Sequence, residues 1–198
     1  MWALVEDNTI TKIINNPKAM VIGSTQYSRN IFSFRWSNAE REAIGIYEVV
    51  FDNTKKKDEE YYINTNQTFT YDADAGTVTA TYGDATAKAH ADANATDDDG
   101  NDLDPVVVIE GLKTKKIRNV KAQAASILTQ TDWYIVRKTD AGTSVPSAIT
   151  NHRAAVRTKC AAMETAITNA SNTPAIETLY TRNVDGVRPL GDLPELEV

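Results

Sequence analysis

The chain has 198 residues, 41% of them apolar, which is enough to form one domain core or two smaller ones and argues against global disorder. Its net charge of −6 argues against a general nucleic-acid binder, because such proteins need a positive field to displace counterions from phosphates. A single cysteine excludes an internal disulfide, and no apolar run is long enough for a membrane span or a signal peptide. We therefore expect a chain that folds in the cytoplasm and binds neither nucleic acid nor membrane.

Residues 1–83 carry mainly strand signals. Residues 2–14 alternate around an acidic turn and predict a hairpin. Ser37 and Glu40 have the spacing of a capping box, which predicts a short helix that ends at Gly45. Further strand-like segments are 46–51, 61–63, 69–71 and 77–82. This part predicts a small, mostly antiparallel β domain with one short helix.

Residues 84–104 are rich in Ala, Asp and Asn and predict an acidic loop or linker. The run from Asp97 to Asp104 invites comparison with a calcium loop. With Gly100 at the sixth position of an EF-hand loop, however, the first position is Ala95 and the twelfth is Val106, and neither residue can supply a carboxylate. We expect a solvated loop, with an irregular calcium site as the alternative.

Residues 105–182 predict a strand and a helical hairpin. Val106–Ile109 has the composition of a buried strand. A first helix carries an apolar stripe at Ile117, Val120, Ala124, Ile127 and Leu128. After it, 134–136 reads as an extended segment. A second helix begins near Ser144, with Pro146 in its first turn.

The second helix carries a long apolar stripe, formed by Ile149, His152, Val156, Cys160, Met163 and Ile167. Its length predicts that it packs on the first helix or on another chain, so a homo-oligomer is a candidate state. A short helix is expected at 175–180 and an extended tail at 183–198. The overall fold class predicted is α+β, with a β-rich N-terminal part and a C-terminal helical hairpin.

Catalytic chemistry finds little support in the sequence. His152 and Cys160 lie eight residues apart on one helix, roughly 12 Å along its axis, whereas a nucleophile and its base need about 3 Å. His90 and Asp92 lack further ligands at metal spacing. We predict no catalytic residue, no cofactor and no metal site. The basic run 113–121 is expected to be a solvated helix start, with a contact to nucleic acid or an acidic partner as the alternative.

The C-terminal half carries Ile127–Trp133, which ends in Thr-Asp-Trp, then Pro146, then His-Arg-Ala-Ala-Val-Arg at 152–157. This order of motifs resembles the phage tail fibre assembly (tail assembly chaperone) family. Two N-terminal stretches, 1–8 and 36–49, are similar to segments of the same tail proteins, especially those of marine phages.

Three positions depart from the family pattern. His152 and Val156 stand where Tyr and Leu are usual, and Ile149 stands where a Trp is usual.

The resemblance implies a non-enzymatic tail protein, made in the host cytoplasm, that binds other phage tail proteins. We expect a structural component of the virion tail, near the fibres or baseplate; the alternative is an assembly chaperone absent from the mature virion. The residues expected to contact a partner are Asp132, Trp133, Arg153 and Arg157. The two arginines lie one turn apart and could bind partner carboxylates, or form a solvated face; Trp133 could instead pack in the core.

Overall fold

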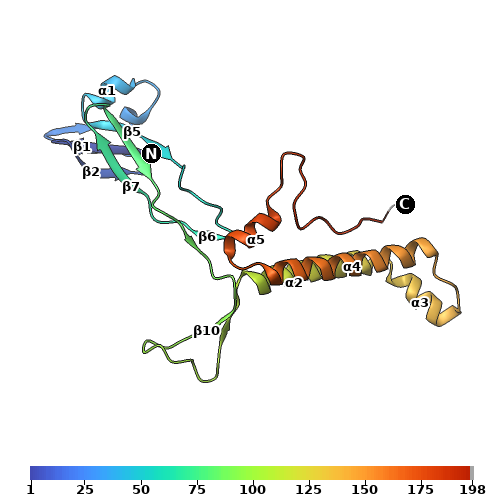
Figure 1. Cartoon of the computed structure of the whole chain (residues 1–198). Coiled ribbons are helices and arrows are strands. Elements are labelled where there is room, and N and C mark those ends of the chain that lie inside the picture. Colours follow the sequence, from blue (N-terminus) through green and yellow to red (C-terminus); the bar gives the residue numbers. More distant parts are fainter. Residues whose placement is uncertain (197–198) are drawn as a thin grey trace. The chain divides into compact units, whose positions relative to one another are not determined.

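The computed structural model describes residues 1–196 (Figure 1). It is mixed α+β, with strand-rich sheets first and helices after residue 112, so the predicted fold class is confirmed. The chain divides into two compact units, Met1–Thr86 and a second that begins at Ala87. Within residues 1–196, no helix combines the length and apolarity needed to cross a bilayer.

The first unit is built on a five-stranded sheet. In spatial order its strands are β2 (Thr9–Ile14), β1 (Trp2–Glu6), β5 (Ile46–Asp52), β8 (Thr77–Thr81) and β7 (Thr68–Asp72). The expected hairpin 2–14 is confirmed, and its turn residues Asp7 and Asn8 both have positive φ, as tight hairpin turns require. All pairings are antiparallel except that of β5 with β8, which is parallel.

Both faces of this sheet are covered by apolar side chains. One face holds a cluster of buried residues: Ala3, Val5, Val49, Val78 and Ala80. On the other face Leu4, Ile14 and Ile46 are buried, and partly buried residues that include Trp2 and Phe32 pack against them. Neighbouring residues of β1 therefore serve opposite faces, because side chains alternate along a strand.

Short elements complete the first unit. They are β3 (Met20–Ile22), β4 (Thr25–Tyr27), η1 (Arg29–Phe32), α1 (Asn38–Glu42) and β6 (Tyr62–Ile63), with β9 (Thr86–Ala87) at the boundary. The capping box at the start of α1 is confirmed: the backbone N–H of Glu40 donates to Ser37 Oγ at 3.3 Å, and the N–H of Ser37 donates to Glu40 Oε2 at 2.7 Å. Gly45 follows the helix with φ of 79°.

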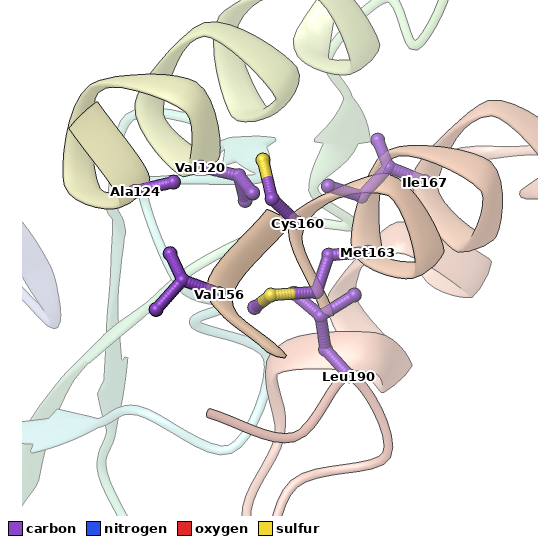
Figure 2. Close-up of a cluster of buried hydrophobic side chains, with 7 residues drawn as sticks. All are labelled: Val120, Ala124, Val156, Cys160, Met163, Ile167 and Leu190. Atoms are coloured by element: carbon purple, nitrogen blue, oxygen red, sulfur yellow. The ribbon is translucent and has the colours of Figure 1, made fainter. Parts of the chain in front are cut away.

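The helices of the second unit are α2 (Leu112–Thr129), α3 (Asp132–Ala141), α4 (Ser147–Asn169) and α5 (Thr173–Tyr180). α2 and α4 pack against each other as the predicted helical hairpin. Figure 2 shows their shared core, in which Val120 and Ala124 of α2 face Val156 and Cys160 of α4. All six residues of the predicted α4 stripe are buried, which confirms that stripe.

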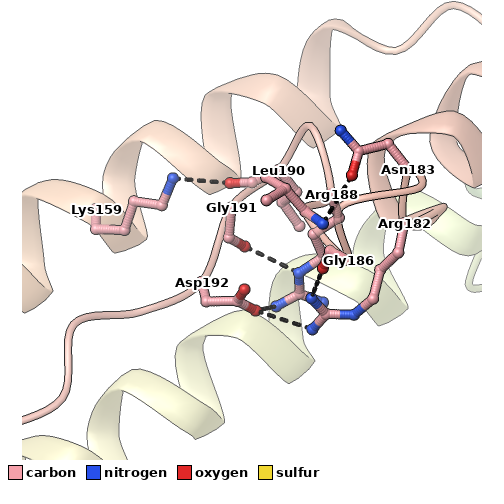
Figure 3. A network of polar contacts seen from close by, with 9 residues as sticks. Lys159, Arg182, Asn183, Gly186, Arg188, Leu190, Gly191 and Asp192 are labelled. Carbon is pink, nitrogen blue, oxygen red and sulfur yellow. Dashed lines mark hydrogen bonds and ion pairs between the residues drawn. The ribbon is translucent and has the colours of Figure 1, made fainter.

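The chain after α5 folds back onto α4. Leu190 is 3% exposed and joins the core of the helical hairpin (Figure 2), while Lys159 donates to its carbonyl at 2.8 Å. Figure 3 shows that Arg182 and Arg188 both pair with Asp192, at 3.5 and 2.7 Å. The expected extended tail thus contains an ordered turn between residues 183 and 192; residues 197–198 lie outside the described residues.

Two local predictions are wrong. Residues 134–136 belong to α3 rather than to an extended segment. Val106–Ile109 is not buried: its side chains are 49–59% exposed, and only Val108–Ile109 forms a strand, β11, paired with β10 (Ala93–Asn94). An apolar run indicates a strand, but a two-stranded ribbon gives it no core to enter.

Candidate partner-binding site

The residues of the Thr-Asp-Trp motif lie where α2 ends and α3 begins. Arg153 reaches this point from α4 and is itself only 8% exposed. Its Nη1 donates to the carbonyl of Leu128 at 2.7 Å and to Thr131 Oγ1 at 2.7 Å. Its Nη2 pairs with Asp132 Oδ1 at 2.8 Å. These contacts define the Arg153 junction, which consists of Leu128, Thr131, Asp132 and Arg153.

The Arg153 junction explains why one helix stops and another starts there. Arg153 places a positive charge against a carbonyl of the last turn of α2, where the helix dipole is negative. Thr131, 2% exposed, leaves helical geometry with φ of −115° and ψ of 5°. Asp132 then supplies a negative charge in the first turn of α3, where the dipole is positive. The junction therefore fixes the start of α3 to α4.

α3 presents large apolar side chains to solvent. None of its ten residues is buried. Trp133 is 51% exposed, Ile135 41% and Val136 64%. Trp133 and Val136 lie about one turn apart on the same side of the helix, whereas Ile135 lies on another side; we call Trp133 and Val136 the α3 face. The ring of Trp133 lies 3.8 Å, centroid to centroid, from that of Tyr134, and the guanidinium carbon of Arg137 lies 4.7 Å from the Trp133 centroid. These contacts restrict the indole while half of it stays exposed.

The structure joins two of the four predicted contact residues directly and places a third beside them. Asp132 pairs with Arg153, and Trp133 follows Asp132 in α3. The guanidinium of Arg153 is occupied by its own chain, so this arginine positions α3 rather than reaching toward a partner carboxylate. Arg157 lies one turn further along α4, is exposed, and takes no part in the junction.

Sequence reasoning missed Thr131, although a signal was present. A threonine followed by an aspartate is a common helix start. In the structure, however, the Thr131 hydroxyl makes no capping bond to α3; it donates to the Leu128 carbonyl at 3.0 Å and accepts from Arg153, so the local signal alone does not fix this helix.

Cys160 is poorly suited to act as a nucleophile. Cys160 is 8% exposed, and burial raises the pKa of its thiol, as does the hydrogen bond to Glu164, whose Oε1 lies 3.4 Å from Sγ. A raised pKa lowers the thiolate fraction that a nucleophile needs. His152 is buried in the same packing stripe.

The basic run at the start of α2 makes contacts within its own unit. Arg118 donates to both carboxylate oxygens of Glu110, each at 2.7 Å. The other contacts are Lys113 Nζ with the Thr168 carbonyl at 2.8 Å, Lys116 Nζ with the Tyr180 ring at 4.0 Å, and Lys121 Nζ with Glu164 at 3.0 Å. These lysines and this arginine are thus engaged by helix and loop neighbours rather than forming one free positive patch.

Polar groups of the acidic loop form hydrogen bonds with one another. The Asp97 carboxylate accepts hydrogen bonds from the backbone N–H groups of Asn101, at 2.9 Å, and Asp99, at 3.0 Å. These bonds lower the pKa of Asp97, and the bond from Asn101 has the largest effect. Within residues 1–196, no three His, Cys, Asp or Glu side chains converge on a point that could hold a metal ion. The calcium alternative therefore gains no converging set of ligands there.

No protein family, curated protein or solved structure matches this chain.

Proposed function

We propose that this chain is a bacteriophage tail structural protein, associated with fibres or baseplate, that works by binding other tail proteins rather than by catalysis. One observation supports the proposal most. The two halves of the resemblance, Thr-Asp-Trp at 131–133 and the 152–157 segment, are some twenty residues apart in sequence and meet in the Arg153 junction. A pattern whose separated parts depend on each other physically is a stronger basis for the resemblance than either part alone.

The junction also supplies a binding mechanism. Tryptophan is among the residues that contribute most to binding where it becomes fully desolvated in an interface. Trp133 is half exposed and already restricted by Tyr134 and Arg137, so little side-chain entropy is lost when a partner covers it. The Arg153 junction holds the helix beneath it. The α3 face is therefore a preorganised contact surface.

The exposed apolar side chains favour the structural role over a transient chaperone. The α3 face and residues 106–109 leave six large apolar side chains between 49 and 64% exposed. Large apolar side chains left exposed together mark interaction sites, and permanent complexes have more apolar interfaces than transient ones. A virion component would keep both surfaces covered after assembly.

The proposal can be tested by site-specific photo-crosslinking in infected cells. A photoreactive amino acid replaces Val136 on the α3 face, and the matched control carries it at Lys138, also exposed, two residues further along the same helix. We expect position 136, and not 138, to crosslink to a tail protein of the same phage, and Trp133→Ala to abolish that crosslink. A crosslink only to proteins outside the tail, or none at all, would contradict the proposal.

A further inference from the structure

The segment from Asp92 to Gly111, which we call the hairpin arm, contains a two-stranded antiparallel ribbon. β10 and β11 pair Ala93 with Ile109 and Asn94 with Val108. The same register continues one residue further, where the N–H of Ala95 donates to the carbonyl of Val107 at 2.7 Å.

The base of the hairpin arm is built tightly onto the start of α2. The Asp92 carboxylate accepts from the N–H of Gly111 at 2.7 Å and from Thr114 Oγ1 at 2.8 Å. These two bonds lower the pKa of Asp92, and the bond from Gly111 has the larger effect. A Cβ on Gly111 would lie 2.3 Å from the carbonyl oxygen of Ala91, so only glycine fits this crossing. The arm is therefore anchored at its root.

Within residues 1–196, β10 and β11 form a sheet of two strands, so no further strand lies beside the outer edge of β11. In an antiparallel ladder, hydrogen-bonded and non-hydrogen-bonded pairs alternate. Because Ala95 and Val107 are hydrogen-bonded, Val108 belongs to a non-hydrogen-bonded pair, and its N–H and C=O point away from β10. The side chains of 106–109 are about half exposed. An apolar strand with an open edge is a template for pairing with another strand.

The charge around this edge selects its partner. Residues 91–112 hold no Lys or Arg and seven acidic residues, of which Asp97, Asp98, Asp99, Asp102 and Asp104 lie at the turn end of the arm. Lys113, Lys115 and Lys116 follow its base at the start of α2, so the acidic side of this edge is the turn end. Arg118 neutralises Glu110, whereas Asp98, Asp99 and Asp104 are exposed. A second copy would bring its own acidic arm to the same place and be repelled. A basic strand would be attracted.

We propose that the open edge of β11 binds, by strand addition, an extended segment of another protein that carries apolar residues at alternate positions and Lys or Arg at the end that lies beside the acidic turn. Backbone hydrogen bonds to Val108 give affinity, the half-exposed side chains of 106–109 give apolar contact, and the aspartates orient the basic end. This surface is distinct from the α3 face and the inference does not depend on the tail function.

The test uses the full chain and a library of nine-residue peptides. Their cores alternate Val, Ile or Thr, and one end, N-terminal or C-terminal, carries either Lys and Arg or Asp and Glu. Binding is measured by fluorescence anisotropy, together with hydrogen exchange of the Val108 amide. Val108→Pro removes the outward N–H without removing a β10–β11 bond, because proline is tolerated where the N–H faces solvent. Val108→Thr is the matched control, since it keeps the backbone donor.

We expect basic-ended peptides to bind and acid-ended ones not to. We expect Val108→Pro to weaken binding about tenfold or more, while Val108→Thr stays within about threefold of the original chain. The Val108 amide should exchange freely alone and become protected with peptide. The inference is overturned if no peptide binds, if Val108→Pro binds as well as the original chain, or if the amide is already protected in the free protein.

Discussion

Replacing Arg153 by methionine should destabilise the helical unit, and the structure indicates by how much. The substitution keeps most of the aliphatic packing but removes two hydrogen bonds from a charged donor, to the Leu128 carbonyl and Thr131 Oγ1. Such bonds contribute about 1.5 kcal/mol each at the lower end of the measured range. The ion pair with Asp132 adds only ~0.5 kcal/mol, because that carboxylate is 51% exposed.

An opposing term reduces this sum. A methionine at 153 no longer requires a guanidinium to be held in a site that is 8% exposed. Because the bond energies above are already net of most of that desolvation cost, this returns only about 1 kcal/mol. The expected net loss in the free energy of unfolding is therefore about 2–3 kcal/mol. With a urea dependence of about 1.5 kcal/mol per M, the midpoint should fall by about 1.3–2 M.

Urea unfolding followed by helical circular dichroism measures this change. Arg157→Met is the matched control, the same substitution one turn along α4 at an exposed position, and should shift stability by less than about 0.5 kcal/mol. Arg153→Lys keeps the charge but not the forked geometry, so it should lie between the original chain and Arg153→Met. If Arg153→Met and Arg157→Met are equally mild, the Arg153 junction does not hold α2 and α3 in place.

Three further predictions follow from packing and backbone geometry. Met163→Ala, at a position 1% exposed, should cost about 2–4 kcal/mol of unfolding free energy by calorimetry, and a cost below about 1 kcal/mol would mean that the α4 stripe is loosely packed. Gly45 and Gly76 both have positive φ, but only at 45 would a new Cβ lie 2.5 Å from a backbone oxygen of β1. Gly45→Ala should therefore lower the melting temperature in calorimetry far more than Gly76→Ala, and equal effects would count against that close approach. Cys160 should react slowly with a thiol reagent until urea unfolds the chain. Glu164→Gln should speed the reaction of the folded protein, because the hydrogen bond and charge of Glu164 help raise the pKa of the thiol. An unchanged rate would show that burial alone protects the thiol.

Local sequence rules predicted the elements that depend on local chemistry. The Ser37–Glu40 capping box and the 2–14 hairpin need only neighbouring residues, and both are present. The α4 stripe was readable because its partner, α2, shows the matching periodicity. These features follow from spacing alone.

Long-range partners decide the elements that sequence reasoning missed. Residues 134–136 are β-rich in composition, yet they are helical because Arg153, from a different helix, fixes the start of α3. Val106–Ile109 looks like a core strand, but the chain places it in a ribbon that offers no core. The parallel pairing of β5 with β8 likewise depends on a chain reversal that no local pattern marks.

Quantitative mass spectrometry of purified phage particles tests the central claim most directly. The amount of this chain is compared with that of the major tail proteins, both in particles and in infected-cell lysate. The structural role predicts a fixed stoichiometry in particles, in a multiple of three or six copies. Abundance in lysate with absence from particles would contradict it and assign the chain to assembly instead.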